Sequence, residues 1–348
     1  MRRRGPTGGV LGEGCVVTEE PILKLERLQK VFGGKIHAVD GVDLEVRKRE
    51  TLALVGESGC GKSTVARLAL RLTAPTAGTI AFEGRDITKL PQWKLKSIRR
   101  RLQFVFQDPY SSLDPRVTAG ASITEPMFVH GLVGFGAKRK AKAGELMEKV
   151  GLSARHVDQW PRQFSGGQRQ RLGIIRAFSV EPHLIVADEP VSALDVSVRS
   201  QVINLLQDLQ ETVGTAYLFI SHDMATVKHI ADRVAVMYLG RIMETAPKET
   251  FFSAPHHPYS QALLSAVPSS HPRRKRQRVV LPGDPPSPAK TPSGCRFHPR
   301  CPMAVDRCRN EVPELRAIGK DHQVACHFAA PNPLNVNELL PAGSTATA

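Results

Sequence analysis

Two glycine-rich stretches of this 348-residue sequence have the chemistry of anion binding. The first, 56-GESGCGKST-64, has the spacing G-x-x-x-x-G-K-[ST], which cradles the phosphates of a nucleotide. Its glycines allow the backbone to curl so that several N–H groups converge on one anion. Lys62 is expected to reach the β- and γ-phosphates, and Ser63 to offer its hydroxyl to Mg²⁺. The expected nucleotide contacts are Gly56, Glu57, Ser58, Gly59, Cys60, Gly61, Lys62, Ser63 and Thr64.

The second stretch, 163-QFSGGQRQR-171, places a serine and two glycines at the start of an expected helix. Free N–H groups and the positive end of the helix dipole attract an anion at such a position. One chain therefore carries two candidate phosphate-binding sites, in the loop at 56–64 and at Ser165–Gln168.

Two neighbouring carboxylates follow the apolar run 184-LIVADEP-190. Asp188 at the end of a strand is suited to holding Mg²⁺ through water. Glu189 is suited to accepting a proton from an attacking water, a contribution of about 10²–10⁴-fold in rate. By themselves the two residues could also be an ordinary acidic pair at a strand terminus, but the phosphate loop upstream favours the catalytic interpretation.

Short apolar strands that alternate with helices are expected to position these groups. After residue 166 the strands are predicted at 184–188 and 216–221 and the helices at 168–180, 196–211 and 224–231, with a hairpin turn at Gly240. Upstream, the strands are predicted at 51–56 and 102–107, with a helix at 62–72. This alternation predicts parallel strands with crossover helices. Residues 22–50 alternate apolar and polar side chains, which predicts half-buried antiparallel strands.

The composition suggests how the chain is divided. Residues 108–165 have turns and helical patterns but few strand signals, which predicts a helical subdomain. We expect a nucleotide-binding domain at 21–260, a C-terminal region at 261–330 that includes a Pro/Ser-rich basic linker at 268–294, and disordered tails at 1–20 and 331–348.

Hydrophobic and charged contents of 41% and 23% are those of a soluble globular protein. No apolar run approaches the roughly 18 residues of a membrane span. The N-terminus has no apolar stretch of signal-peptide length, so the chain is expected in the cytoplasm. The net charge of +15 is compatible with nucleic-acid binding or with a basic surface attracted to anionic lipid. The basic runs are dispersed, which favours the second interpretation.

Several motifs occur together in one order: GESGCGKST, Gln107 after a strand, FSGGQ at 164–168, LIVADEP, SALD at 192–195 and His222 in ISHD. In this combination residues 22–260 resemble the ATP-binding subunit of an ABC transporter. The resemblance implies an α/β fold, namely a P-loop NTPase core with an antiparallel β subdomain and a helical subdomain. It also implies ATP hydrolysis with ATP and Mg²⁺.

The resemblance assigns the second glycine-rich stretch a partner. Two such subunits associate head to tail, so that Ser165, Gly166, Gly167 and Gln168 would bind the γ-phosphate of the nucleotide held by the other subunit. Phe164 stands where leucine is common and remains apolar.

The resemblance also carries over to single positions. Gln107 would contact Mg²⁺ and the attacking water, Asp195 would link the two sites, and His222 would orient Glu189 as the base. Phe32 would stack on adenine, although a phenylalanine in an apolar strand can equally belong to the core. A lone histidine at position 222 could likewise be a surface residue.

A narrower resemblance comes from 107-QDPYSSLDPR-116, 188-DEPVSALDVSVRSQVINLLQDLQ-210, 255-PHHPYSQALLSAVP-268 and 294-GCRFHPRCPMA-304 with 324-VACH-327. These stretches resemble the oligopeptide/dipeptide importers, especially the second ATPase subunit of such systems. The implied partners are two transmembrane permease subunits, a second ATPase chain that is similar but different, and an extracytoplasmic substrate-binding protein, with no nucleic acid. The implied place is the cytoplasmic face of a bacterial membrane. Import of another substrate such as nickel, and a soluble ABC ATPase without transport, are the alternatives.

Four of the six cysteines, Cys295, Cys301, Cys308 and Cys326, cluster near the C-terminus with the spacing C-x5-C-x6-C-x17-C. In a cytosolic chain such a cluster suggests a metal before disulfides. Zinc sites favour tight C-x2–4-C pairs, which are absent here. Zinc and free thiols remain alternatives, but the wider spacing and the family resemblance favour a structural [4Fe–4S] cluster in a small C-terminal cysteine-containing extension.

Overall fold

The computed structural model describes residues 20–108, 112–266 and 281–330. The tails expected at 1–20 and 331–348 lie outside the described residues, except for Glu20. Residues 268–280 of the expected linker also lie outside them.

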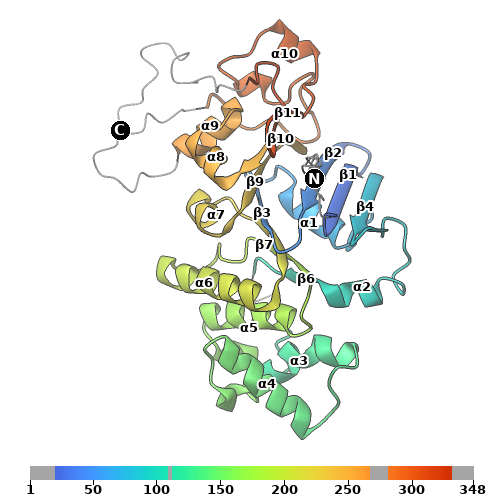
Figure 1. Ribbon diagram of the computed structural model, residues 1–348, viewed down its shortest axis with the longest axis vertical. Coiled ribbons are helices and arrows are strands. Elements are labelled where there is room, and N and C mark those ends of the chain that lie inside the picture. The colour runs from blue at the N-terminus through green and yellow to red at the C-terminus, as the bar shows by residue number, and fades with distance from the viewer. Residues whose placement is uncertain (1–19, 109–111, 267–280, 331–348) are drawn as a thin grey trace, which may run out of the picture.

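An eight-stranded sheet with the order β11-β12-β10-β9-β3-β8-β7-β6 runs through the molecule (Figure 1). Its parallel part consists of β9, β3, β8, β7 and β6, and β10 pairs antiparallel with β9. The bounds are β3 Thr51–Val55, β6 Leu102–Val105, β7 Leu184–Asp188, β8 Ala216–Ile220, β9 Arg233–Tyr238 and β10 Arg241–Pro247. Every residue of β3, β7 and β8 is buried, because helices or other strands cover both faces of a parallel sheet.

The helices that follow these strands are α1 Lys62–Ala69, α5 Gly166–Phe178, α6 Val196–Val213 and α7 Met224–Ile230, and α2 Lys96–Arg101 precedes β6. Their buried faces carry mainly aliphatic residues that pack on the sheet in three hydrophobic clusters. Together with the sheet they confirm the predicted α/β fold class.

A second sheet is antiparallel and four-stranded, with the order β2-β1-β4-β5. Its strands are β1 Leu23–Phe32, β2 Ile36–Val46, β4 Ala77–Phe82 and β5 Arg85–Asp86. Alternating positions of β2 are buried toward its C-terminal end, as the alternating sequence predicts. β4 and β5 complete this sheet although no strand was predicted there.

Helices alone occupy the lower end of the molecule in Figure 1. They are α3 Ala119–Val129, α4 Ala137–Lys149 and the short 3₁₀ helices η1 Ala154–His156 and η2 Pro161–Gln163. All lie within the range 108–165 that the sequence suggested as a helical subdomain. α3 packs on α4 and α5, so these helices are joined to the main sheet through α5.

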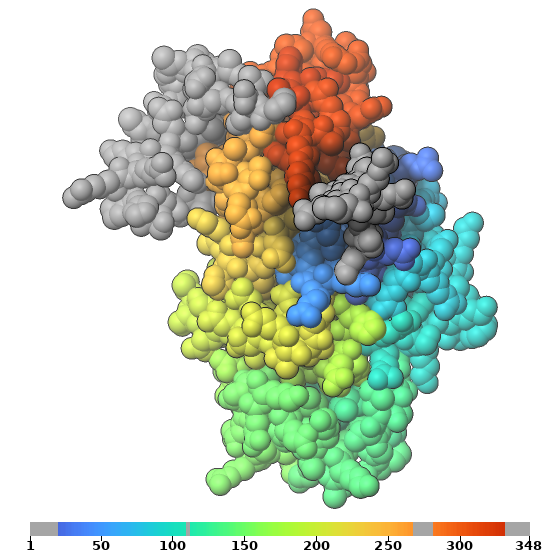
Figure 2. Space-filling view, in the orientation of Figure 1, coloured from blue at the N-terminus to red at the C-terminus, as the bar shows by residue number. Residues whose placement is uncertain are grey.

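The C-terminal extension (residues 281–330) lies at the opposite end, coloured orange to red in Figure 2. It contains η3 His298–Arg300, α10 Asp306–Asn310, β11 Arg316–Gly319 and β12 His322–Val324, and α8 Lys248–Ser253 and α9 Pro258–Ser265 lead toward it. β12 pairs with β10, so the extension adds two strands to the main sheet.

A fully buried carboxylate holds this junction together. Glu244 of β10 is 0% exposed, and its two oxygens accept hydrogen bonds from the backbone N–H groups of His256 at 2.8 Å and His257 at 2.9 Å. His322 Nε2 of β12 lies 2.8 Å from the same carboxylate. A buried charge persists only when it is paired and hydrogen-bonded in this way.

The buried His257 predicts how the stability depends on pH. Its Nδ1 accepts a hydrogen bond from the backbone N–H of Tyr259 at 3.0 Å and so caps α9. Burial lowers the pKa of His257 from 6.5 to about 4, although Glu244 acts in the opposite direction. The unfolded chain therefore binds this proton more readily, and stability is lost as the pH falls from 6.5 toward 4.

For His257 alone this loss amounts to about 2 kcal/mol in the free energy of unfolding between pH 7 and pH 5. Urea unfolding at the two pH values measures it. In His257→Asn, a capping oxygen remains but does not titrate. The free energy of unfolding should therefore change between pH 7 and pH 5 by about 2 kcal/mol less than in the unsubstituted chain. An equal pH dependence in both proteins would remove His257 as its source.

Candidate functional site

The phosphate loop connects β3 to α1 and is pressed between two other strands. A Cβ atom on Gly56, which has φ +152°, would lie 2.2 Å from the carbonyl oxygen of Met237 in β9. A Cβ atom on Gly61, with φ +112°, would lie 2.1 Å from the carbonyl oxygen of Ala38 in β2. Only glycine fits both positions, so packing against β2 and β9 defines the curl of the loop.

Lys62 lies inside this loop and is only 5% exposed. Its Nζ donates hydrogen bonds to the carbonyl oxygens of Gly56 at 2.8 Å and Glu57 at 2.9 Å. The ammonium group is therefore already within the cradle, with backbone carbonyls as its partners. A phosphate in the loop would offer a charged acceptor and a stronger hydrogen bond.

The two residues expected to hold Mg²⁺ from the loop and from β7 are in contact. Ser63 Oγ donates a hydrogen bond to Asp188 Oδ1 at 3.0 Å. Burial raises the pKa of Asp188, and the charge of Glu189 adds to this, whereas the hydrogen bond from Ser63 opposes it. Hard oxygen atoms at this spacing suit Mg²⁺, and a divalent cation would favour the ionised carboxylate.

Glu189 lies where three neighbouring strands of the sheet end. Gln107, after β6, donates from Nε2 to Glu189 Oε2 at 3.0 Å, and His222, after β8, places Nδ1 3.1 Å from Glu189 Oε1. Both carboxylate oxygens are therefore oriented by side chains from the flanking strands. Glu189 also has φ +46°, a strained conformation that recurs at functional sites.

The second glycine-rich stretch begins α5 with a capping box. Ser165 Oγ accepts from the backbone N–H of Gln168 at 3.3 Å, and Gln168 Oε1 accepts from the backbone N–H of Ser165 at 2.9 Å. A Cβ atom on Gly166 would meet no atom within 4 Å, whereas one on Gly167 would lie 2.5 Å from Val198 of α6. Gly166 therefore faces open space. Phe164, two residues earlier, is buried in a hydrophobic cluster.

The structure links two of the three predicted groups. Ser63 and Asp188 join the phosphate loop to β7, and Glu189 follows Asp188 directly, so the loop, the carboxylates, Gln107 and His222 form one site. Ser165–Gln168 belong to the start of α5, which Figure 1 shows in a different part of the molecule from α1.

Two further predicted residues lie apart from this centre. Asp195 is the exposed N-cap residue of α6. Phe32 ends β1 with 43% of its surface exposed, and Lys30 Nζ lies 5.1 Å from the centre of its ring. An aromatic ring with this exposure is available for stacking, so its contact with adenine stays a prediction.

Sequence reasoning missed two residues that contact the loop. Arg300 of the C-terminal extension and Tyr259 of α9 both bind Glu57. The only signal in the sequence is a carboxylate inside a phosphate-binding loop, which calls for a compensating positive charge.

Comparison with known proteins agrees with this geometry. Residues 39–192 match the family model described as ABC transporter, and residues 243–308 match the one described as oligopeptide/dipeptide transporter, C-terminal region. The chain is 54% identical over 296 residues to a probable peptide ABC transporter ATP-binding protein, y4tS, of Sinorhizobium fredii, covering 85% of this chain and 84% of that protein. It is 50% identical over 323 residues to the oligopeptide transport ATP-binding protein AppF of Bacillus subtilis, covering 89% and 98%. The chain belongs to the ABC transporter family of ATP-binding proteins.

The solved structures support this ABC transporter fold. A dimeric post-hydrolysis state of the ATP-binding cassette MJ0796, bound to ADP and phosphate, superposes with a TM-score of 0.60 at 28% identity and covers 65% of this chain and 98% of that one. ATP is therefore the nucleotide for the phosphate loop, with Mg²⁺ as its cation. None of the helices described for this ABC protein is long and apolar enough to cross a membrane.

The predicted [4Fe–4S] cluster is wrong. The matched ABC family models and the relatives' names point to nucleotide binding and transport, and none points to iron–sulfur chemistry. Within the described ranges, the only three metal-ligating side chains whose ligand atoms lie within 4.8 Å of one another are Glu244, His256 and His322, with no cysteine among them.

Three of the four cysteines of the extension, Cys295, Cys301 and Cys308, instead pack as small apolar groups. Cys295 and Cys308 belong to a hydrophobic cluster with Phe297. Burial raises the pKa of Cys295 to about 11 and that of Cys301 to about 12, so these thiols are protonated at neutral pH.

Proposed function

We propose that this chain is the ATP-hydrolysing subunit of an importer for short peptides. It would couple ATP binding and hydrolysis to transport through partner permease subunits. The observation that carries the proposal is the combination of a continuous ATP site with the oligopeptide/dipeptide C-terminal region, in a chain half identical to AppF over nearly its full length.

The proposed hydrolysis uses the groups described above. The N–H groups of the loop and Lys62 bind the β- and γ-phosphates, and Ser63, Gln107 and Asp188 hold the cation. Mg²⁺ supplies charge neutralisation on the phosphates. Glu189 accepts the proton of the attacking water, and Gln107 and His222 orient its carboxylate.

We further propose that the site is completed by a second ATPase chain, similar to this one but different from it. The start of α5 supports a facing chain, whether different or identical, since Gly166 meets open space and the capping box leaves N–H groups at a positive helix end. Asp195, exposed at the start of α6, would lie at the same interface. ATP would then be enclosed between the loop of one chain and Ser165–Gln168 of the other.

The remaining partners follow from the importer role. A groove lies between the main sheet and the helices at 119–177, where Leu72 and Phe106 are exposed. We propose that the permease subunits dock on this helical side of the molecule. An extracytoplasmic binding protein would deliver the peptide, and the chain would be peripheral on the cytoplasmic face of a bacterial membrane, without nucleic acid.

Deletion of the gene is expected to abolish uptake of labelled tri- to pentapeptides, and expression of the unsubstituted chain should restore it. Glu189→Gln should restore none, because hydrolysis supplies the energy of transport. Glu211→Gln, the same change at an exposed position of α6, serves as the matched control and should restore uptake. If peptide uptake survives the deletion and nickel uptake is lost, the transported substrate is nickel and not a peptide.

A further inference from the structure

The C-terminal extension reaches the phosphate loop through one arginine. Arg300, the last residue of η3, donates from Nη1 to Glu57 Oε2 at 2.8 Å and from Nη2 to Glu57 Oε1 at 3.2 Å. Such a two-pronged pair fixes the orientation of both side chains as well as their distance. Because Glu57 is the second residue of the loop, its side chain is held by a residue 243 positions away in the sequence.

The backbone of Glu57 is held by the same end of the molecule. Its N–H group donates a hydrogen bond at 2.9 Å to the hydroxyl oxygen of Tyr259, a fully buried residue of α9. This N–H group therefore has a partner within the protein. The phosphates are left to the N–H groups that follow in the loop and to Lys62.

Both anchors rest on a packed aromatic cluster. The ring of Tyr259 lies 4.7 Å from that of Tyr238 and 5.3 Å from that of Phe297, and the rings of Tyr238 and Phe297 lie 5.4 Å apart. Tyr238 belongs to β9 of the main sheet, whereas Phe297 belongs to the extension. Such a cluster is rigid, so Arg300 and Tyr259 are presented to the loop from a fixed platform.

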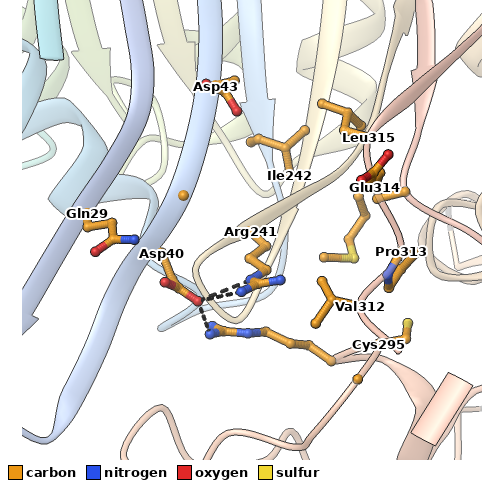
Figure 3. A pocket seen from close by; sticks show the side chains of 15 residues that line it. Gln29, Asp40, Asp43, Arg241, Ile242, Cys295, Val312, Pro313, Glu314 and Leu315 are labelled. Carbon is orange, nitrogen blue, oxygen red and sulfur yellow. Dashed lines mark hydrogen bonds and ion pairs between the residues drawn. The ribbon is translucent and has the colours of Figure 1, made fainter. Parts of the chain in front are cut away.

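A second ion-pair group joins the extension and β10 to β2 of the antiparallel sheet. Arg241 of β10 and Arg296 of the extension both bind Asp40 of β2, and Figure 3 shows the side chains of Arg241 and Asp40 pointing at each other. Ala38, whose carbonyl oxygen packs against Gly61, lies two residues before Asp40. The extension is thus tied to both sides of the phosphate loop.

The charge of Glu57 explains why an arginine is needed here. Glu57 is the second residue of the loop that must bind a triphosphate, so a carboxylate without a counter-charge at this position would add negative charge to the loop. Like charges at close range repel strongly in a partly buried site. The side chain of Arg300 is only 8% exposed, and its guanidinium neutralises this carboxylate.

We propose that Arg300 and Tyr259 are positioning residues for the phosphate loop: they hold Glu57 in place and neutralise its carboxylate, so that ATP affinity depends on the C-terminal extension. The proposal goes beyond peptide import and rests only on ATP binding at the loop.

The test is the ATPase kinetics of the purified full-length chain. Arg300→Gln is expected to raise the KM for ATP about tenfold, the effect of losing one hydrogen bond to a charged group, with little change in kcat. The increase should be larger at low salt, because the exposed carboxylate of Glu57 then repels ATP most. Arg300→Lys keeps the charge but not the two-pronged geometry, so its KM for ATP should lie between those of the unsubstituted chain and Arg300→Gln.

A second substitution distinguishes the loss of charge compensation at Glu57 from a general disturbance of the structure. Glu57→Gln added to Arg300→Gln removes the uncompensated carboxylate and should recover most of the lost affinity. Arg316→Gln is the matched control, because among the described residues Arg316 donates hydrogen bonds only to the backbone carbonyls of residues 326, 327 and 329 within the extension. An Arg300→Gln protein with an unchanged KM, or a double variant as weak as the single one, would overturn the proposal.

Tyr259→Phe keeps the test decisive if Arg300→Gln does not fold. It retains the packed ring and removes only the acceptor of the Glu57 N–H group, so a raised KM with an unchanged melting temperature supports the proposal, and an unchanged KM contradicts it. ATP binding by the unsubstituted chain is measured first. Its absence would contradict the proposed function, whereas a failure confined to the variants contradicts only the role of Arg300 and Tyr259.

Discussion

Glu189→Gln is expected to lower kcat for ATP hydrolysis by about 10²–10⁴-fold. Glutamine has the same shape and can still be held by Gln107 and His222, which lie 3.0 and 3.1 Å from the two carboxylate oxygens. However, it cannot accept a proton from the attacking water. Phosphate release measures turnover, and binding of a fluorescent ATP analogue should remain close to that of the unsubstituted chain.

The control for Glu189→Gln is Glu211→Gln, the same change at an exposed position of α6. This variant should hydrolyse ATP at the unsubstituted rate. Undiminished turnover in Glu189→Gln would remove Glu189 as the base. A loss of both turnover and ATP binding would instead show that Glu189 supports the shape of the site.

Gly61→Ala is expected to weaken ATP binding more than about 100-fold and to lower the free energy of unfolding by about 2–4 kcal/mol. The new Cβ atom would lie 2.1 Å from the backbone carbonyl oxygen of Ala38, at a φ of +112° that alanine rarely adopts. Neither β2 nor the loop can give way without opening the phosphate cradle. ATP titration and urea unfolding measure the two effects.

Gly131→Ala provides the matched control for this substitution. Gly131 also has a positive φ, +70°, but a Cβ atom there would meet nothing within 4 Å, and the residue lies between α3 and α4, away from the loop. Its cost should be about 1–2 kcal/mol of stability, with no effect on ATP binding. Equal ATP affinity in the Gly61→Ala and Gly131→Ala proteins would show that the loop tolerates the contact with β2.

The local sequence predicted the central strands well because their residues are almost all apolar. The runs at 184–188 and 216–220 are buried strands as expected, since a short apolar run between turn signals has few other solutions. Boundaries were less accurate. The helix expected from residue 168 begins at Gly166, because the capping box of Ser165 and Gln168 starts it two residues earlier.

The pairing of the extension with the main sheet could not be predicted. β12 has three residues and joins β10 by two residue pairs, which is too short for a periodic pattern. What secures it is the buried contact of Glu244 with His322, between residues 78 positions apart. The cysteine spacing in the same region misled the sequence reasoning, because spacing along a chain does not distinguish metal ligands from buried thiols.

The sequence by itself determined the phosphate loop, the acidic pair after β7 and the helix start at Ser165, because each depends on residues within about ten positions of one another and on local backbone physics. Only the tertiary structure decided which of these groups meet. It joins Ser63 to Asp188 and orients Glu189 through Gln107 and His222, because adjacent parallel strands end at one edge of the sheet. It also places Arg300 against Glu57, because side chains far apart in the sequence come into contact only when the sheet and its extension are packed together.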